Sequence, residues 1–292
     1  MMFDENYEVV VADTPSSRYI HHRIRYQVYC VEEAFEDPGR YPDGQEQDAW
    51  DDNAVHFIVR DRHCGEWIGA MRLIKPANRT LPIQRIAQID GSKLPPDLVP
   101  GRAWELSRIC ILRERRRSMN RWSSAYCATA LSGGISTTPV RSHDDRRQSI
   151  DWGAMSRLRT ALRAGSKTGF TGAALGLRQR VNGSEVLAGM LRAAIEYARD
   201  SDYEVRYFYF LINPAMARMV GKMQFDICRI GDVCKHRGIR YPYFGALDEA
   251  VYGAVMRSPE MAQLFLHGDD SYRFYSAMQP NAIMEQQNVS AA

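Results

Sequence analysis

The chain has 292 residues, of which 45% are hydrophobic and 25% charged, and its formal net charge is +3. This length permits one or two domains around a sizeable core. No run of about 18 apolar residues occurs, so we expect no membrane span, and the acidic residues 1–13 lack the basic and then apolar pattern of a signal peptide. We therefore expect a cytoplasmic protein.

The charges are spread unevenly along the chain. Residues 32–52 contain nine acidic side chains and one basic one, whereas residues 113–180 contain fourteen basic and four acidic ones. This asymmetry predicts a cationic ligand at the acidic segment and an anionic partner at the basic segment. Ordinary solvated surface charge is the alternative, and it competes more strongly for the basic segment.

The first half of the chain alternates between apolar runs and polar turns. The predicted elements are a strand at 7–11, a helix from Ser16 or Ser17 to about residue 31, an acidic loop at 37–53, a hairpin of strands at 55–60 and 66–74, and a strand at 104–112. His21 and His22 are expected on the surface of the helix, with no metal role.

The second half starts with a basic segment that is poor in large aliphatic residues. The predicted elements are a flexible insertion at 113–180, a helix at 184–199 with a capping box of Asn182 and Glu185, a strand at 207–212, a helix at 215–223 after Pro214, strands at 225–230 and 239–244, and a weak helix with a polar tail. Helices between strands predict a mixed α/β sheet covered by helices. We expect one domain over 1–250 and a C-terminal helix and tail over 251–292.

The six cysteines form no CxxC pair, so the sequence predicts no metal site. They stand in apolar surroundings and are interpreted as buried, reduced bystanders. Cys110 is the alternative, a candidate nucleophile, because it follows one of the motifs described next.

Four motifs follow one another between about residues 20 and 110. They are Arg25-Tyr-Gln-Val-Tyr29 with Phe35-Glu36 after it, Glu46-Gln-Asp48-Ala-Trp50-Asp51, Gly69-Ala-Met-Arg72-Leu-Ile, and Trp104-Glu105-Leu-Ser107-Arg108. Their order and spacing resemble the N-terminal half of acyl-homoserine-lactone (autoinducer) synthases. The resemblance implies an acyltransferase of the GNAT fold, with a mixed, mostly antiparallel twisted sheet flanked by helices. The insertion after the fourth strand departs from those shorter synthases.

Two C-terminal segments resemble another group. Tyr207–Pro214, and His236-Arg237-Gly238-Ile-Arg240-Tyr-Pro242, are similar to acyltransferases associated with exosortase (PEP-CTERM) systems and to N-acyl amino acid synthases. This resemblance implies that a long acyl chain on acyl carrier protein, or on coenzyme A, is transferred to an amino acid or similar small amine. It implies no cofactor, no metal and no covalent acyl-enzyme. Formation of an acyl-homoserine lactone from S-adenosylmethionine is the alternative.

The motifs contain carboxylates that suit this chemistry. Amide formation from a thioester needs a neutral amine, a route for its proton, and donors for the oxyanion. Asp48 and Asp51, three residues apart on a loop, can face a cationic amino substrate, and Glu105 can take the amine proton directly or through water. These three residues are the catalytic candidates; a purely structural network is the alternative.

Further motif residues are candidates for substrate binding. Guanidinium groups can pair with the catalytic carboxylates or bind a substrate carboxylate through two hydrogen bonds. The binding candidates are Arg25, Arg72 and Arg108, the aromatic residues Tyr29, Phe35 and Trp50, and Ser107. A structural role for the arginines and for Ser107, and a plain core role for Tyr29 and Trp50, are the alternatives.

The family resemblance implies that the pantetheine arm of the donor lies between the strands at 104–112 and 207–212. Four arginines directly after the first of these strands are candidates for docking the acidic carrier protein: Arg113, Arg115, Arg116 and Arg117. Nucleic-acid binding is a competing explanation of the basic segment, but its few aromatic residues are not interleaved as a stacking platform, so no nucleic-acid partner is expected. A degenerate acyltransferase that only binds is the other non-enzymatic alternative, and the presence of all three catalytic candidates argues against it.

Overall fold

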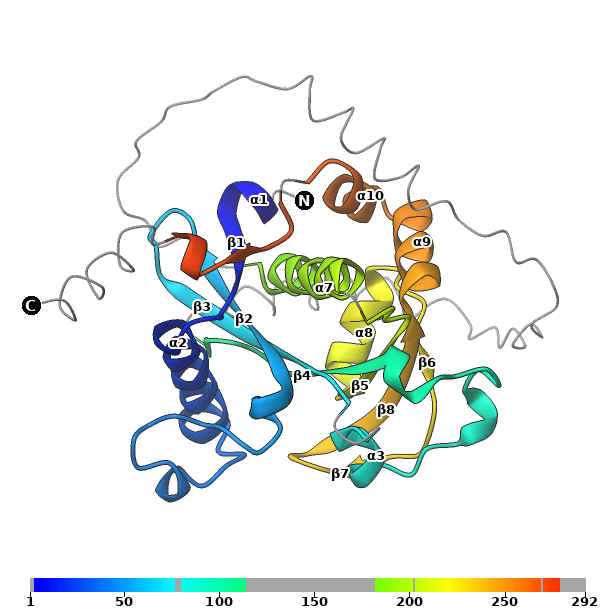
Figure 1. The fold of residues 1–292 in the computed structure, drawn as a ribbon, viewed down its shortest axis with the longest axis horizontal. Coiled ribbons are helices and arrows are strands. Elements are labelled where there is room, and N and C mark those ends of the chain that lie inside the picture. Colours follow the sequence, from blue (N-terminus) through cyan, green and yellow to red (C-terminus); the bar gives the residue numbers. More distant parts are fainter. Residues whose placement is uncertain (1–2, 77–79, 114–181, 202, 269, 279–292) are drawn as a thin grey trace, which may run out of the picture.

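A nine-stranded mixed sheet forms the centre of the computed structural model, which describes residues 3–76, 80–113, 182–201, 203–268 and 270–278 (Figure 1). The strand order is β6-β8-β5-β4-β3-β2-β1-β9, and β7 pairs with β8 outside this path. The strands are β1 (Tyr7–Val11), β2 (Ala54–Asp61), β3 (Trp67–Ile74), β4 (Ala103–Ile111), β5 (Tyr207–Ile212), β6 (Cys228–Arg229), β7 (Cys234–Lys235), β8 (Ile239–Ala246) and β9 (Arg273–Phe274).

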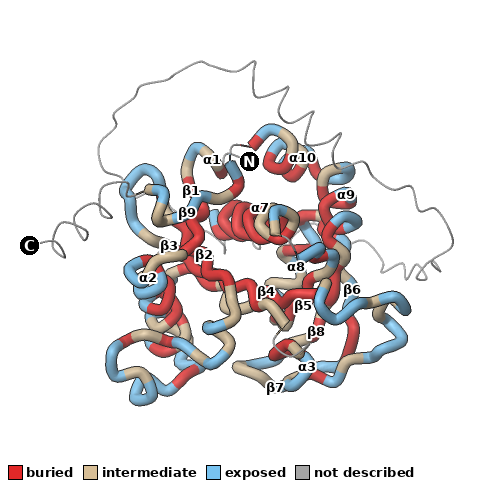
Figure 2. Tube along the Cα trace, viewed as in Figure 1, coloured by how far each residue is buried: buried red, intermediate tan, exposed pale blue. Residues whose placement is uncertain are grey.

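Helices cover both faces of this sheet, as the sequence predicted. The described helices are α1 (Phe3–Asn6), α2 (Pro15–Tyr26), α3 (Pro82–Ile86), α7 (Gly183–Asp200), α8 (Pro214–Lys222), α9 (Leu247–Arg257) and α10 (Pro259–Leu266). The main core lies under α7, with α8, α9 and α10 around it, whereas α2 and α3 cover the opposite face. Figure 2 shows α7 and the central strands buried, with exposed loops around them.

The alternation of side chains along the strands explains this division. On β1, Val9 and Val11 pack into the core under α7, and Val10 packs under α2. The valines favour an extended strand because their branched side chains pack well on a pleated surface. The strand is buried on both faces, so it is apolar without interruption, as parallel-sheet strands often are.

Strands β4 and β5 pair in parallel and then diverge. Their register runs from Ala103 opposite Tyr207 to Leu106 opposite Phe210, although both strands continue. Beyond this point β4 pairs with β3, and β5 pairs with β8. The sheet therefore opens between the two strands next to Glu105 and Ser107, where the sequence resemblance places the pantetheine arm.

Three local predictions were wrong. Thr14, two or three residues earlier than expected, caps α2 by accepting a hydrogen bond from Ser17 N at 3.2 Å. Asn182 precedes α7 but makes no side-chain capping bond, and it accepts instead from the Ser184 hydroxyl at 2.7 Å. The strand expected at 225–230 is reduced to the two residues of β6, because the chain before it turns at Gln224, which has a φ of +62°.

The C-terminal part of the described chain belongs to the same core. The predicted boundary at residue 250 lies inside α9, and Val251, Leu264 and Phe265 pack in the cluster under α7. Strand β9, which the sequence analysis did not predict, adds to β1 in parallel. No helix in the described ranges is long and apolar enough to cross a membrane.

Candidate functional site

The register of three neighbouring strands brings polar side chains into one row on the face under α2. His56 on β2 lies opposite Arg72 on β3, and Arg72 lies opposite Ser107 on β4. Glu105 stands in the next row on the same face, opposite Ile74. Because side chains alternate between faces along a strand, residues in such register must point to the same side. Arg72 Nε donates to the Ser107 hydroxyl at 3.1 Å, so Ser107 is a hydrogen-bonding residue here.

Arg108 reaches the same face because β4 is bulged. The pairing with β3 shifts between Ala70 and Arg72, and Arg108 has a φ of +52°. A bulge places two residues opposite one and turns the side chains beyond it to the other face. Ser107 and Arg108 can therefore both face α2. A positive φ is unfavourable for arginine, and such strain often marks a functional site.

The loop after α2 supplies the acidic side of the site. It is attached to the helix by a bond from Glu46 N to His22 O at 3.2 Å, and it turns at Gly44, which has a φ of +68°. Asp48 N donates to the Asp51 carboxylate at 2.7 Å, which folds the Glu-x-Asp-x-x-Asp segment into a turn. All three carboxylates point toward the polar row of the sheet, where they meet three arginines.

Arg25 and Arg72 bind these carboxylates from two sides. Arg25 Nε donates to Glu46 and its Nη1 to Asp51, both at 2.5 Å. Arg72 Nη1 donates to Asp48 at 2.6 Å and to Asp51 at 2.9 Å. The side chain of Arg25 has no exposed surface and that of Arg72 is 2% exposed, so both arginines hold the acidic loop on the sheet instead of facing solvent.

Arg108 completes the arrangement from β4. Its guanidinium donates to Glu46 and to Asp48, each at 2.9 Å. The charged cluster, as we name it, consists of Arg25, Arg72, Arg108, Glu46, Asp48 and Asp51. The sequence named all of its members as candidates except Glu46, which stands in the same motif as Asp48 and Asp51.

The cluster keeps its carboxylates ionised. Burial alone would raise the pKa of each carboxyl, but the neighbouring guanidiniums reverse the effect and hold the pKa of Glu46 at about 2 and the pKa values of Asp48 and Asp51 below their usual range. Asp48 is the most accessible carboxylate, with 29% of its side chain exposed, against 8% for Asp51 and none for Glu46. Asp48 is therefore the member best placed to meet a substrate.

Glu105 lies beside the cluster but has no guanidinium of its own. The Ile83 N–H donates to its carboxylate at 2.8 Å. Burial raises the pKa of Glu105 to about 7, although the bond from Ile83 and the charges of Arg72 and Arg108 favour the ionised form. A carboxylate with a pKa near neutral pH is suited to exchange protons with a reacting group. Its place directly before the divergence of β4 and β5 fits that role.

Aromatic side chains form a wall next to the cluster. The guanidinium of Arg108 lies 5.3 Å from the centre of the Tyr29 ring, and the Tyr29 and Phe35 rings are 6.3 Å apart. Phe35 is 37% exposed, so this wall reaches the protein surface. Trp50 lies apart from this wall, near α3, with Arg85 over its ring at 4.9 Å. The structure therefore brings the predicted binding residues Tyr29 and Phe35 together with Arg108, whereas Trp50 lies outside this aromatic wall.

Three buried histidines lie under the cluster. His21, His22 and His56 are in mutual ring contact, with centroids 4.6–5.5 Å apart. The prediction that His21 and His22 lie on the helix surface is wrong, because their residues are 0% and 7% exposed. Burial lowers all three pKa values, that of His56 to about 4, so the rings are neutral. The described residues contain no group of side chains arranged to hold a metal ion.

Each ring contacts a backbone carbonyl at or beside a cluster residue. His22 Nδ1 lies 3.2 Å from Glu46 O, His56 Nε2 lies 3.2 Å from Asp51 O, and His21 Nε2 lies 3.3 Å from Met71 O, next to Arg72. The histidines therefore join the acidic loop to the sheet. The alternation of side chains along β2 and β3 could have predicted a place for His56 in the site, because His56 lies on the same face of the sheet as Arg72.

We expect these histidines to make stability depend on pH. A pKa of about 4 for His56, below the ordinary 6.5, means that the stability gained from the neutral ring is complete above pH 6.5 and is lost as pH falls toward 4. His56→Gln keeps a donor for Asp51 O but cannot take up a proton, so urea unfolding of this variant should depend less on pH across that window. His63→Gln, on the exposed turn after β2, is the control; an equal slope in wild type and His56→Gln would contradict the assignment.

The β7–β8 hairpin contacts the loop after α2 beside this aromatic wall. Arg237, near its tip, donates from Nε to the carboxylate of Glu36, and its Nη2 forms an ion pair with the same carboxylate. His236 and Arg240 stand beside it, and the guanidinium of Arg240 lies 5.6 Å from the centre of the Phe35 ring. The motif containing these residues was identified in the sequence but was given no place in the site, because only the fold shows that Arg237 meets a residue 201 positions earlier.

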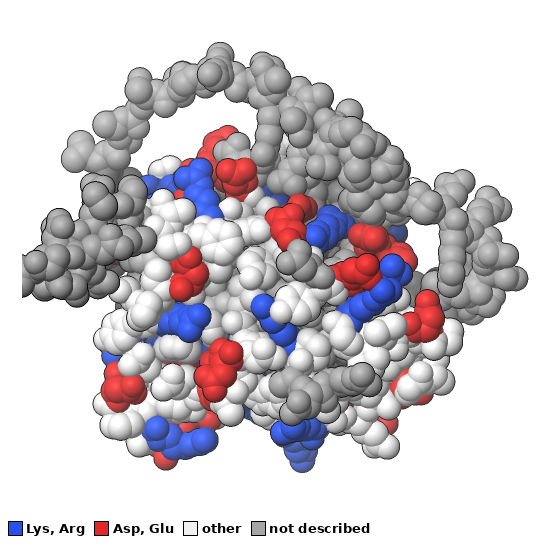
Figure 3. Space-filling view, viewed as in Figure 1, with Lys and Arg blue, Asp and Glu red and all other residues white. Residues whose placement is uncertain are grey.

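Of the predicted carrier-docking residues, Arg113 is the one that lies in the described part of the chain, directly after β4. Arg113 N donates to Glu32 at 2.9 Å, and its guanidinium contacts the Glu32 carbonyl and lies 3.7 Å from Glu33. Arg115, Arg116 and Arg117, with the rest of the basic insertion, lie outside the described residues. On the face shown in Figure 3, basic and acidic side chains of the described residues are interspersed.

The cysteines are less uniform than predicted. Cys30 and Cys110 are buried, but Cys64 and Cys228 are exposed, so the expectation of buried bystanders is wrong for these two. Cys234 is intermediate, and Cys127 lies outside the described ranges. Cys110 lies opposite Ala70 in the sheet and packs in the core under α2.

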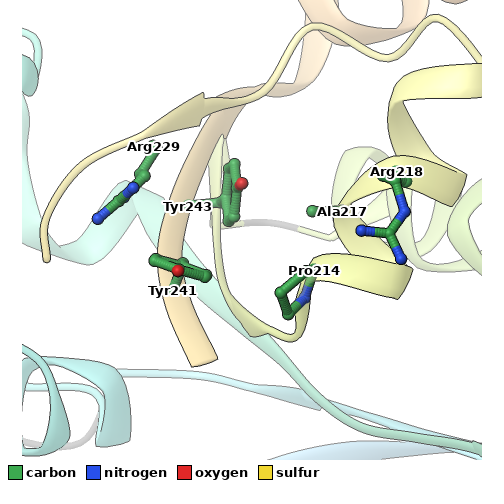
Figure 4. A pocket seen from close by; sticks show the side chains of 6 residues that line it. All are labelled: Pro214, Ala217, Arg218, Arg229, Tyr241 and Tyr243. Atoms are coloured by element: carbon green, nitrogen blue, oxygen red, sulfur yellow. The ribbon is translucent and has the colours of Figure 1, made fainter. Parts of the chain in front are cut away.

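A separate hollow of about 310 Å³ lies where β5 leads into α8. Figure 4 shows Pro214, Ala217 and Arg218 of α8 on one side, and Arg229 with the rings of Tyr241 and Tyr243 on the other. Arg229 lies over Tyr241 at 4.2 Å and donates to Gly231 O at 2.8 Å. Arg218 forms no hydrogen bond or ion pair with the part of the chain that the structure describes. The hollow therefore offers an unpaired guanidinium at the same end of the sheet as the opening between β4 and β5.

Comparisons with known proteins agree with this fold. Residues 24–122, which hold the whole charged cluster, match the model of the acetyltransferase (GNAT) domain. The sequence matches none of the curated proteins with which it was compared.

Solved structures are similar over most of the chain. They include BjaI, a CoA-dependent acyl-homoserine lactone synthase, with MTA (TM-score 0.51, 13% identity, covering 92% of this chain and 92% of that one). TofI, in a ternary complex with an inhibitor and MTA, has a TM-score of 0.48 at 17% identity, and the match covers 87% of this chain and 99% of TofI. FeeM, an N-acyl amino acid synthase from uncultured soil microbes, has a TM-score of 0.40 at 12% identity, and the match covers 86% of this chain and 96% of FeeM.

The domain match and the architecture together define the class. The chain has the GNAT fold, with a mixed, mostly antiparallel sheet flanked by helices, and residues 24–122 match the GNAT acetyltransferase domain. The fold and the match over residues 24–122 support an acyltransferase of the GNAT type, as the four sequence motifs predicted.

Proposed function

We propose that the protein moves an acyl chain from a carrier thioester to the amino group of an amino acid or similar small amine by direct attack. The observation that carries the proposal is Glu105, a buried carboxyl with a pKa of about 7, at the point where β4 and β5 diverge. A thioester between these strands would place its carbonyl next to a group that can take up a proton at neutral pH.

The reaction balances without a further reagent. The amine attacks the thioester carbonyl and forms the new C–N bond, and Glu105 takes the proton that the nitrogen loses, directly or through water. The oxyanion would be held by main-chain N–H groups on the open edge of β4 beyond Leu106. Collapse breaks the C–S bond, and the departing thiolate receives the proton from Glu105, which returns to its starting state.

The charged cluster supports this reaction by fixing the active-site wall. Arg25 and Arg72 are almost fully buried and hold Asp51 and Asp48 against the sheet. Asp48 is partly exposed and can hold the ammonium form of the substrate, whose first proton passes to solvent before the neutral amine attacks. We therefore assign substrate contact to Asp48 and a positioning role to Asp51, Arg25 and Arg72.

The donor is proposed to be an acyl carrier protein, with acyl-CoA as the competing donor. Arg113 is engaged with residues 32 and 33, so the free charge for docking would come from Arg115–Arg117 and from Arg218. The hollow beside Arg218 lies at the end of β5 that the arm of the donor would approach. An acidic carrier helix and its phosphate are suitable ligands for such guanidiniums.

Charge reversal should separate these docking surfaces. We expect the triple change of Arg115, Arg116 and Arg117 to Glu to raise the Kd for acyl carrier protein by about 10-fold or more and to flatten its dependence on salt. Arg218→Glu should do the same if the hollow contributes, and Arg273→Glu on β9, at the far edge of the sheet, is the control. Unchanged carrier binding and salt dependence in both variants would contradict docking at this end of the sheet.

Thiol release tests the proposal. Purified protein is supplied with a long-chain acyl carrier protein or the matching acyl-CoA, together with an amino acid, a simple amine or S-adenosylmethionine, and the product is identified by mass. Amine-dependent release with an N-acyl amino acid supports the proposal. An acyl-homoserine lactone would establish the alternative synthase reaction, and release without any amine would indicate a hydrolase.

A further inference from the structure

Arg237 at the tip of the β7–β8 hairpin and Glu36 in the loop after α2 join these two segments, and we name this contact the rim. Arg237 binds Glu36 across this rim, with Arg237 at a φ of +50° and Gly238 at +91°. The hairpin turn is therefore held in a left-handed conformation that aims residue 237 at the loop. The same contact fixes Arg240, two residues beyond Gly238, over Phe35.

Arg240 is a guanidinium without a carboxylate partner among the described residues. Among the described residues, its guanidinium contacts the Phe35 ring and donates a long hydrogen bond of 3.5 Å to the carbonyl of Ile239, its own neighbour. The acidic groups nearby are already engaged: Glu36 binds Arg237, and Glu33 lies 3.7 Å from Arg113. Partial burial lowers the pKa of Arg240, and the charge of Arg237 adds to the effect.

The balance of charges points to an anionic ligand at this position. Within the cluster, three guanidiniums face three carboxylates, and each carboxylate is paired. On the rim, the buried carboxylate of Glu36 is bound by Arg237 and also lies 3.5 Å from Arg40 and 4.0 Å from Arg108, so it is not available to Arg240. One half-buried positive charge therefore remains, and a planar guanidinium is geometrically matched to a carboxylate through two hydrogen bonds.

We propose that Arg240 binds the carboxylate of the acceptor, so that the acceptor is an amino acid and not a simple amine. This inference rests on the proposed function and specifies its substrate. Tyr29 and Phe35 form the apolar wall between Arg240 and Arg108, where the side chain of the amino acid would lie. With the carboxylate held at the rim, the amino group is directed inward, toward Asp48 and Glu105.

Kinetics with a matched pair of acceptors test this assignment. The acceptors are an amino acid and its primary amide, which differ in the carboxylate alone. We expect Arg240→Met to raise the KM for the amino acid by about 10- to 100-fold, with kcat and the KM for the amide little changed, because a charged, two-bond contact is lost. Arg240→Lys should restore part of the affinity. Lys235→Met, on the exposed neighbouring strand β7, is the control for loss of a cation from the hairpin.

The outcomes separate this site from the proposed function. Equal effects on the amino acid and the amide, or no effect on either, would overturn the role of Arg240 while transfer to amines stands. If wild type transfers to no amine, calorimetry with an N-acyl amino acid and its amide decides: binding of the acid that weakens at least about 10-fold in Arg240→Met supports the carboxylate site. Binding that is absent, or that does not depend on Arg240, overturns it. Thermal melts of each variant check that the fold is retained.

Discussion

Replacing Glu105 by Gln should lower kcat by about 10²- to 10⁴-fold, the usual contribution of a positioned general base. Gln keeps the size of the side chain and an oxygen that can accept from Ile83 N–H. It cannot take up a proton, so proton removal from the amine is left to water. The matched control is Glu8→Gln, which changes a buried carboxyl on β1 that pairs with Arg60; its kcat should stay near wild type.

The pH dependence follows from the same carboxyl. In wild type, kcat/KM should rise as the pH passes about 7, because the ionised form of Glu105 is the one that accepts a proton. Stability should move the opposite way: a folded pKa of about 7, above the ordinary 4.5, gives stability that is complete below 4.5 and is lost as pH rises through 7. Over this range the loss is at most about 3 kcal/mol.

Glu105→Gln should therefore lose activity without losing stability. As the pH rises, the stability of wild type should fall relative to that of the variant. Urea unfolding near pH 5 and near pH 8 measures this difference directly. A variant that is inactive because it is unfolded would contradict the catalytic role. So would a folded variant with wild-type kcat, since the proton would then leave by another route.

Replacing Arg25 by Met should destabilise the fold by about 3–5 kcal/mol, because the change leaves two buried carboxylates short of their partner. Arg25 has no exposed surface and binds Glu46 and Asp51, both at 2.5 Å. Arg108 and Arg72 still contact these carboxylates, so the fold should survive in mild conditions. The measurement is the free energy of unfolding in urea near neutral pH.

A double-mutant cycle shows whether the loss comes from the ion pair. Adding Glu46→Gln to Arg25→Met should recover part of the lost stability, because the double variant removes the carboxylate of Glu46 that the loss of Arg25 leaves without this partner. Arg102→Met, which breaks an exposed pair with Glu204, should cost about 1 kcal/mol or less. If Arg25→Met were no more harmful than Arg102→Met, the cluster would not be what holds the acidic loop on the sheet.

Much of the fold could be predicted because its strands are strongly patterned. The runs at 7–11, 207–212 and 239–244 lie within β1, β5 and β8, and the hairpin at 55–74 is formed by β2 and β3. Short elements without a pattern of their own were missed: β7 and β9 have two residues each and exist because β8 and β1 offer them an edge. Tertiary pairing, not local sequence, defines such strands.

The site was predicted in part because its residues fall within contiguous motifs. Arg25, Arg72 and Arg108 were expected near Asp48 and Asp51, and the structure brings these five together. What the sequence could not show is which contacts face solvent. Arg25 and Asp51 were named beside Asp48 as possible substrate contacts, but burial leaves Asp48 as the accessible one.

Long-range contacts account for the residues that were missed. The histidines under the cluster come from α2 and β2, and nothing in their local pattern predicts that three imidazoles share one buried space. Arg237 and Arg240 reach the site only because the β7–β8 hairpin folds over the loop after α2. Such meetings depend on the register of the whole sheet, which a single sequence does not encode locally.

Formation of an amide bond is the central claim, and a doubly labelled transfer tests it most directly. The protein is incubated with an acyl carrier protein that bears a ¹³C-labelled acyl chain and with a ¹⁵N-labelled amino acid, and the product is analysed by mass, with Glu105→Gln in parallel. We predict an N-acyl amino acid that carries both labels and forms far more slowly with Glu105→Gln. Labelled free fatty acid as the sole product, or equal yields with both proteins, would contradict direct transfer assisted by Glu105.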